Sequence, residues 1–265
     1  MPTMKLGRRT VEPGRRRRRL SSGLTLALAL GTVGVGYSFL APSSSAEDSG
    51  LSVEAQAGQE LFEVGCITCH GANLQGVDNR GPSLVGIGEA AVYFQVSTGR
   101  MPCVQNEAQC PVKDPIYTDA EVNQLMAYIQ ANGGGPTLPT GDLRDGDLAE
   151  GGELFRLNCA SCHNFAGRGG ALSAGKYAPS LAGSSDLVIY SAMLSGPQSM
   201  PVFGDNQLTP EQKRSVINYV QTLKESQDPG GLAIGRAGPV PEGLVIWIVG
   251  IAACIGAALW VGSRS

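Results

Sequence analysis

A motif of two cysteines and a histidine, Cys-x-x-Cys-His, occurs twice in this chain of 265 residues. The two copies supply Cys66, Cys69 and His70, and then Cys159, Cys162 and His163. Two thiols at this spacing can each form a thioether to one vinyl group of a porphyrin. The histidine that follows directly is then placed to bind the iron from one side. The motifs therefore predict two covalently attached c-type haems.

Two other kinds of site also use paired cysteines. A structural zinc site binds thiolates with tetrahedral geometry, and a redox-active dithiol needs only the Cys-x-x-Cys spacing. Neither chemistry accounts for a histidine directly after the second cysteine in both copies. Haem is the favoured interpretation, and zinc or dithiol chemistry is the alternative.

The sixth ligand of each iron has to come from a residue other than histidine. The chain contains two histidines, and the motifs use both. Methionine is a common partner of histidine on the iron of c-type cytochromes, and the chain has six methionines. Met126 and Met193 fall on apolar helical patterns and are expected in the core, whereas Met1 and Met4 precede the first apolar segment.

Met101 and Met200 remain as the candidate axial ligands. Each precedes a proline, which favours extended backbone and hence a loop that presents the side chain. They follow His70 and His163 by 31 and 37 residues, so they occupy matched positions in the two copies. The alternative for either methionine is to fill space in the core.

Three cysteines lie outside the motifs. Cys103 and Cys110 flank a short loop just after Met101 and have no counterpart in the second copy. We predict a disulfide between them, which would restrain the segment that carries Met101, with two free thiols as the alternative. Cys254 lies in an apolar run and is expected to pack as a small apolar residue.

The residues around the motifs repeat as well. The sequence Glu-Leu-Phe ends four residues before the first cysteine of each motif, and a Pro-Ser-Leu segment follows each motif. Each copy closes with an amphipathic helical pattern, which begins at Thr118 with Glu121 three residues later, or at Thr209 before Pro210. A duplicated helical domain is the simplest explanation. The predicted domains cover residues 51–132 and 148–227, and the predicted linkers cover residues 133–147 and 228–243.

Two apolar segments bracket these domains. The first segment, residues 20–40, is uncharged and follows a basic stretch at residues 1–19. The second segment, residues 244–261, is also uncharged. Both segments are long enough to be read as transmembrane helices. The basic stretch predicts a cytoplasmic N-terminus, with the haem domains on the extracytoplasmic side and both termini in the cytoplasm. A signal peptide cleaved near Ser-Ser-Ala at residues 44–46 is the alternative for the first segment.

The charge is unevenly distributed. Residues 1–20 contain eight basic residues and one acidic residue, whereas residues 47–240 contain 21 acidic and 11 basic residues, a net charge of −10. An acidic body argues against nucleic acid as a partner. The basic end is explained by the membrane segment that follows it.

Each copy resembles the small mono-haem cytochrome c fold. The resemblance rests on Cys-x-x-Cys-His, on Gly-Pro-x-Leu twelve residues after the first histidine, and on the loop methionine. In that family a proline carbonyl accepts a hydrogen bond from the haem-binding histidine and orients it. The resemblance assigns this role to Pro82 and Pro179. The second copy departs, with Ala178 in place of glycine and 16 residues from His163 to Pro179.

The whole chain resembles the dihaem cytochrome c subunit of the actinobacterial-type cytochrome bcc complex. The resemblance implies an all-α fold, with two tandem class I-like cytochrome c domains flanked by N- and C-terminal transmembrane helices. It also implies a plasma-membrane complex with a cytochrome b subunit and a Rieske iron–sulfur subunit. In such a complex the haems relay electrons from quinol oxidation to an aa3-type oxidase. The chain would take part in the reductase as its electron-transfer subunit, without a catalytic site of its own.

Three other functions are compatible with parts of this sequence. The electron-accepting dihaem subunit of a membrane-bound dehydrogenase would carry the same motifs. A dihaem peroxidase is disfavoured because no spare histidine is present to act as a distal base. A soluble binding module is disfavoured by the predicted anchors.

Overall fold

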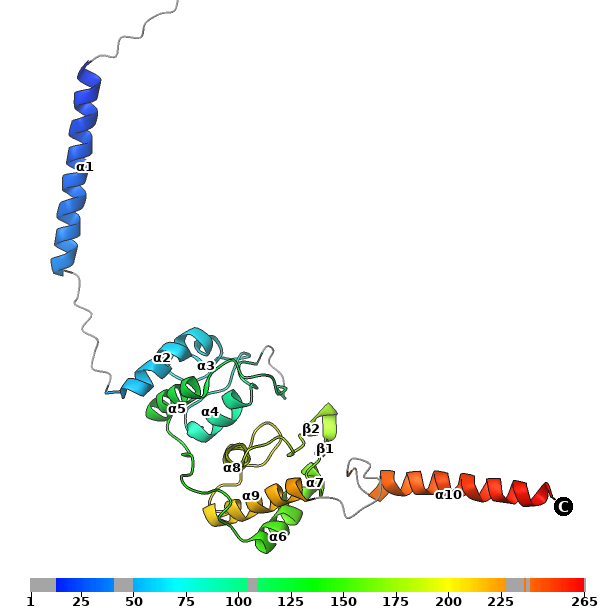
Figure 1. Ribbon diagram of the computed structural model, residues 1–265. Helices are drawn as coiled ribbons and strands as arrows, with labels where there is room; N and C mark the ends of the chain where they lie inside the picture. The colour runs from blue at the N-terminus through cyan, green and yellow to red at the C-terminus, as the bar shows by residue number, and fades with distance from the viewer. Residues whose placement is uncertain (1–12, 41–49, 104–108, 227–235, 237–238, 265) are drawn as a thin grey trace, which may run out of the picture. The chain divides into compact units, whose positions relative to one another are not determined.

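The computed structural model describes residues 13–40, 50–103, 109–226, 236 and 239–264. The chain divides into two units, residues 1–50 and residues 51–265. The second unit contains both Cys-x-x-Cys-His motifs, and its helices form two groups (Figure 1). Each group contains one motif, so the duplication seen in the sequence corresponds to two helical bodies.

The first group consists of α2 (Val53–Gly65), α3 (Ile67–His70), α4 (Gly88–Ser97) and α5 (Asp119–Gly133). Ser52 caps the first turn of α2, and Thr118 and Glu121 form a capping box at the start of α5. The apolar face of α5 packs against α2 and α4. Phe62 and Tyr128 meet in this core with their ring centroids 5.3 Å apart.

The second group repeats this plan with α6 (Leu148–Asn158), α7 (Ala160–His163), α8 (Asp186–Ser195) and α9 (Pro210–Glu225). The crossing of the first and last helices is equally close in both groups. A Cβ atom on Gly58 of α2 would collide with the carbonyl of Gln124, and one on Gly151 of α6 would collide with that of Ser215. Glycine at these two matched positions therefore lets the helix backbones approach each other.

A short hairpin departs from the all-α expectation. β1 (Gly170–Ala171) pairs antiparallel with β2 (Tyr177–Ala178), and a 3₁₀ turn, η1 (Ser173–Gly175), connects them. The loop between histidine and proline is four residues longer in the second copy. Ala174 at φ 57° and Gly175 at φ 73° turn the chain back on itself in this longer loop. The fold is thus mostly helical, with one two-stranded hairpin.

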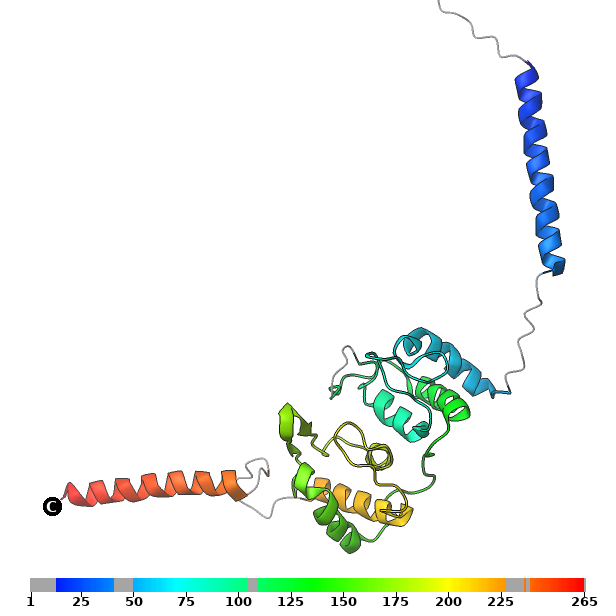
Figure 2. The ribbon, with the colours of Figure 1, turned by 180° about the vertical axis from the view of Figure 1, so that it is seen from behind.

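The two groups pack against each other through α4 and α8, as the front and rear views both indicate (Figures 1 and 2). Ala90 of α4 is fully buried and belongs to the core cluster of the second group. Leu138, in the segment predicted as a linker, packs against the cores of both groups. Residues 133–147 therefore contribute to the packing between the domains.

Two further helices, α1 (Pro13–Leu40) and α10 (Pro239–Gly262), lie outside these groups. Among the described residues one helix, Val240–Gly262, is long and apolar enough to cross a bilayer, with a mean hydropathy of 2.5. In α1 the described side chains, Gly23–Tyr37, are apolar or uncharged, and they lie within the uncharged run of residues 20–40. The helix begins at Pro13, seven residues before the predicted segment, because arginine is a good helix former and proline suits the first turn.

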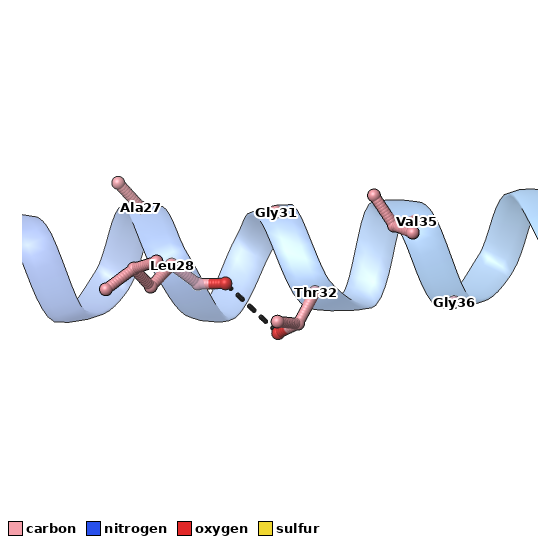
Figure 3. A pocket seen from close by; sticks show the side chains of 6 residues that line it. All are labelled: Ala27, Leu28, Gly31, Thr32, Val35 and Gly36. Carbon is pink, nitrogen blue, oxygen red and sulfur yellow. Dashed lines mark hydrogen bonds between the residues drawn. The ribbon is translucent and has the colours of Figure 1, made fainter.

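A shallow groove runs along the apolar part of α1 (Figure 3). Small side chains form it, since Gly31 and Gly36 leave the backbone uncovered beside Thr32. The Thr32 hydroxyl donates to the carbonyls of Leu28 (3.0 Å) and Ala29 (2.9 Å). This polar group is therefore satisfied within the helix, as an apolar environment requires.

Candidate haem sites

The first motif folds into the tight turn that follows α2. Cys66 ends α2 and precedes α3, and its carbonyl accepts hydrogen bonds from the backbone N–H of Cys69 (3.1 Å) and of His70 (3.0 Å). His70 Nδ1 lies 2.8 Å from the carbonyl oxygen of Pro82. A carbonyl can only accept, so Nδ1 carries the proton and Nε2 keeps its lone pair for a metal. This is the tautomer that an iron ligand needs.

The second motif has the same geometry. The carbonyl of Cys159 accepts from the N–H of Cys162 (3.1 Å) and of His163 (2.9 Å). His163 Nδ1 lies 3.0 Å from the carbonyl oxygen of Pro179, despite the longer loop between them. Burial lowers the pKa of His163, and the hydrogen bond to Pro179 opposes that effect. In both copies the carbonyl thus accepts from Nδ1, which leaves Nε2 available for a metal.

The first cysteine of each motif is poorly suited to thiolate chemistry. Burial, with a smaller effect of the neighbouring motif cysteine, raises the pKa of Cys66 and of Cys159 to about 11. Redox-active dithiols and zinc ligands instead need an accessible thiolate. Across the part of the chain that the structure describes, no three His, Cys, Asp or Glu side chains gather as a metal-binding group. The raised pKa of the first cysteine argues against a reactive dithiol in either motif.

Both candidate axial methionines lie in loops beside the motifs. Met101 follows α4 and packs against the same core cluster as Cys66 and Ile67. Met200 follows α8 and packs against the cluster that contains Cys159. Each loop methionine therefore shares a core with the motif of its own domain. Their role as iron ligands stays a prediction.

The other two methionines of the haem domains fill the core. Met126 is 8% exposed in the cluster of the first domain, and Met193 is 2% exposed in that of the second. The expectation of core packing from their helical patterns is confirmed for both.

The loops that follow the two methionines are held in different ways. Cys103 and Cys110 form a disulfide in the first domain. In the second domain the fully buried Lys213 binds the Asp205 carboxylate (2.6 Å) and the Leu208 carbonyl (2.7 Å) through Nζ. A covalent bond in the first domain, and in the second an ion pair between a buried lysine and an exposed aspartate, thus restrain the two segments.

Two glycines near the histidines are functional positions that the sequence reasoning missed. Gly76 and Gly169, both at φ 81°, donate their N–H groups to the carbonyls of His70 and His163, each at 2.8 Å. A Cβ atom on either would lie 2.8 Å from the carbonyl carbon of the proline that orients the histidine. A side chain here would push that carbonyl away. The available signal was a glycine six residues after each histidine.

Comparisons with known proteins agree with this geometry. The cytochrome c family model matches residues 55–132, and the model of the cbb3-type cytochrome c oxidase subunit III matches residues 146–220. A protein of Mycobacterium tuberculosis (strain H37Rv), named cytochrome bc1 complex cytochrome c subunit, is 53% identical over 95% of this chain and 93% of its own length. The chain belongs to the family of cytochrome bc1 complex cytochrome c subunits.

Relatives from other species support the same assignment. The Mycobacterium leprae protein of that name is 53% identical over 92% of this chain and 88% of its own length. The Corynebacterium diphtheriae protein is 48% identical over 96% of this chain and 98% of its own length. The resemblance found in the sequence is confirmed, and so are two covalently bound c-type haems, one for each domain. The chain is a cytochrome c electron-transfer subunit of a membrane complex.

Proposed function

We propose that this chain is the membrane-anchored dihaem subunit of a menaquinol–cytochrome c reductase. In this proposal it takes electrons from a Rieske iron–sulfur centre and passes them through its two haems to an aa3-type oxidase. The observation that carries the proposal is the near full-length identity of about one half to cytochrome bc1 complex cytochrome c subunits. A cytochrome b subunit, the Rieske subunit and the oxidase are the partners that it requires.

The residues of each domain suit electron transfer. A c-type haem supplies one-electron redox chemistry at its iron. His70 and Met101 would hold the first iron, and His163 and Met200 the second. With both axial positions filled by protein, no coordination site is left for a substrate, which favours electron transfer over activation. Pro82 and Pro179 keep the imidazoles in the iron-binding tautomer through the hydrogen bonds described above.

The two terminal helices supply the proposed membrane topology. Residues 20–40 and α10 would each cross the plasma membrane, with both termini in the cytoplasm and the haem domains outside. The apolar length of α10 supports one crossing. The uncharged run after the basic N-terminal stretch supports the other. Two anchors would keep both haems at a high effective concentration near their donor and acceptor.

Purification through an affinity tag on this chain, in mild detergent, tests the proposed complex. We expect a cytochrome b subunit, a Rieske subunit and an aa3-type oxidase to co-purify in stable ratio. Recovery of the subunits of a dehydrogenase in their place would contradict the proposal and support the alternative that the sequence left open.

The axial ligands are tested separately with Met101→Ala and Met200→Ala. Each variant should lose the absorption of one methionine-ligated low-spin haem and lower the reduction potential of that haem. Met126→Leu is the matched control, since Met126 packs in the core and the change conserves volume. Spectra unchanged from the wild type in both alanine variants would show that other ligands hold the irons.

A further inference from the structure

The two haem domains differ at two insertions, one in each domain. The segment between Met101 and Thr118 is eight residues longer than the one between Met200 and Thr209, and it contains the disulfide loop. The segment between histidine and proline is four residues longer in the second domain, and it forms the β1–β2 hairpin. Neither insertion is needed to attach a haem, because the other domain lacks it.

These two insertions contact each other. The Gln109 side chain, beside Cys110, donates from Nε2 to the carbonyl of Tyr177 (2.7 Å). It also accepts at Oε1 from the N–H of the same residue (3.1 Å). The side-chain amide therefore satisfies both backbone groups of Tyr177 on β2, as a neighbouring strand would. Because the Gln109 amide pairs with both the N–H and the carbonyl of Tyr177, the two hydrogen bonds fix both its position and its orientation.

A second hydrogen bond crosses between the domains nearby. Gln198 Nε2 donates to the carbonyl of Cys110 (3.1 Å). Gln198 has φ 59°, a left-handed conformation that is uncommon outside glycine. Cys110 is thus held in place by its disulfide to Cys103. The β1–β2 hairpin binds the residue before it, Gln109, and Gln198 in the segment of Met200 binds the Cys110 carbonyl.

The residues that make these contacts are close in sequence to residues of the haem sites. Tyr177 precedes Pro179, whose carbonyl orients His163, by two residues. Gln198 precedes Met200 by two residues, and Cys103 follows Met101 by two. Gln109 and Cys110 of the first domain therefore contact the segment whose Pro179 orients His163 and the segment that carries Met200.

We propose that Gln109 and Cys110, held by the Cys103–Cys110 disulfide, form a clamp between the domains that positions the Pro179 and Met200 segments of the second haem site. Gln109 is its main positioning residue, and the Cys110 carbonyl is its second anchor. The clamp fixes the two haems relative to each other and holds Pro179 and Met200 in place from the neighbouring domain. The inference rests on the haem-ligand assignment proposed above and goes beyond it, because it makes the second haem depend on a loop of the first domain.

Amide hydrogen exchange of the purified full-length complex tests the clamp directly. Gln109→Met removes both hydrogen bonds with little change in side-chain size. The Tyr177 N–H should then exchange faster than in the wild type. The N–H of Leu172 in the same hairpin bonds to the Lys176 carbonyl (2.8 Å), so its exchange should stay unchanged. A Tyr177 N–H that exchanges equally slowly in Gln109→Met and wild type would overturn the proposal.

Electron paramagnetic resonance of the oxidised protein provides a second readout. In Gln109→Met the low-spin signal of the second haem should broaden, as its histidine and methionine lose a fixed orientation, while the first haem keeps its signal. The distribution of inter-haem distances should also widen. The double variant Cys103→Ser, Cys110→Ser should have the same effects on the second haem and on the distance distribution, and it should also loosen the segment that carries Met101. Gln59→Ala, which removes a glutamine paired on the surface with Glu63 (2.9 Å), is the control.

These outcomes are independent of the proposed partners. If the second haem and the distance distribution match the wild type in both clamp variants, the clamp is wrong even when the reductase subunits co-purify. If those subunits are absent but the Gln109→Met effects appear, the clamp stands and the proposed complex fails. Equal haem content in wild type and variants checks that the domains have folded.

Discussion

At the scale of single residues, the haem sites depend on small backbone groups as much as on the ligands themselves. Each histidine is oriented by a proline carbonyl, and each proline segment packs against a glycine with positive φ. The sequence predicts the motif residues because cysteine and histidine at this spacing carry distinctive chemistry. It does not predict the glycines, because a glycine acquires meaning only when its φ angle and its neighbours are known.

The substitution Gly169→Ala tests this dependence. A Cβ atom at φ 81° is itself unfavourable, and here it would also press on the carbonyl carbon of Pro179, 2.8 Å away. We expect a cost of at least about 2 kcal/mol in the free energy of unfolding of the second domain. The His163 hydrogen bond should weaken, and the reduction potential of the second haem should change. Guanidinium titration followed by haem absorbance measures the first effect, and potentiometry the second.

The control for this change is Gly183→Ala. Gly183 lies in the same domain, and a Cβ atom there would meet nothing within 4 Å. Its unfolding free energy should stay within about 0.5 kcal/mol of the wild type. If Gly169→Ala were as stable as Gly183→Ala, the glycine would have no part in holding Pro179.

At the scale of elements, the two domains begin their last helices with related capping boxes that differ in charge. Thr118 and Glu121 form the box of α5, whereas Thr209 and Gln212 form that of α9. Hydrogen bonds from the Thr118 backbone and side chain lower the pKa of Glu121. A box that uses glutamine cannot titrate in this way. Acid should therefore weaken the cap of the first domain but not that of the second.

The variant Glu121→Gln tests this difference. Because the pKa of Glu121 is lower in the folded protein than in the unfolded chain, the unfolded chain binds more protons as the pH falls. Glu121 thus contributes fully to the free energy of unfolding above the ordinary pKa of glutamate, about 4.3. This contribution is lost as the pH falls through the pKa of Glu121 in the folded protein. The difference in stability between wild type and Glu121→Gln should be constant near neutral pH and change below about pH 4.5.

Unfolding of the first domain at a series of pH values measures this difference. Glu54→Gln serves as the control, since Glu54 also lies in a first helical turn but its carboxylate has no hydrogen bond to another described residue. If the free energies of unfolding of wild type and Glu121→Gln differ by a constant amount down to pH 3, the charge of Glu121 does not contribute to the cap of α5.

The helices differ in how far they could be predicted. The closing helices α5 and α9 were predicted because capping residues and apolar periodicity agree in both. The sequence does not predict α4, since Ala90 packs in the core of the second domain while Val92 and Val96 pack in that of the first. A helix buried on two sides has no single apolar stripe to detect. The β1–β2 hairpin escaped prediction for another reason, because its two-residue strands are too short for a period to appear.

At the scale of the whole molecule, duplication explains most of the architecture, and the contacts between the domains explain the remainder. The repeated motifs indicated two similar domains, but they carried no information on how α4 meets α8 or how residues 133–147 pack. Such contacts join residues far apart in the sequence and depend on three-dimensional register. The insertions that break the repeat were visible as differences in loop length, yet their contact with each other was not.

The membrane anchors are the remaining feature of the whole molecule, and deletion of residues 239–265 tests them. The deletion removes α10, the one described helix that is long and apolar enough to span a bilayer. We expect the shortened protein to keep both haems, because both core clusters lie between residues 51 and 223. It should also stay in the membrane fraction after a carbonate wash, since residues 20–40 would still cross the bilayer.

A matched protein separates the retained anchor from a cleaved signal peptide. This protein combines the deletion of residues 239–265 with replacement of residues 1–46 by a signal peptide that is known to be cleaved. It should appear in the extracytoplasmic soluble fraction with both haems attached. If the simple deletion behaves in the same way, the first apolar segment is removed during export and α10 is the only anchor. If it stays in the membrane, both terminal helices anchor the chain, and the haem domains are tethered to the bilayer at both ends.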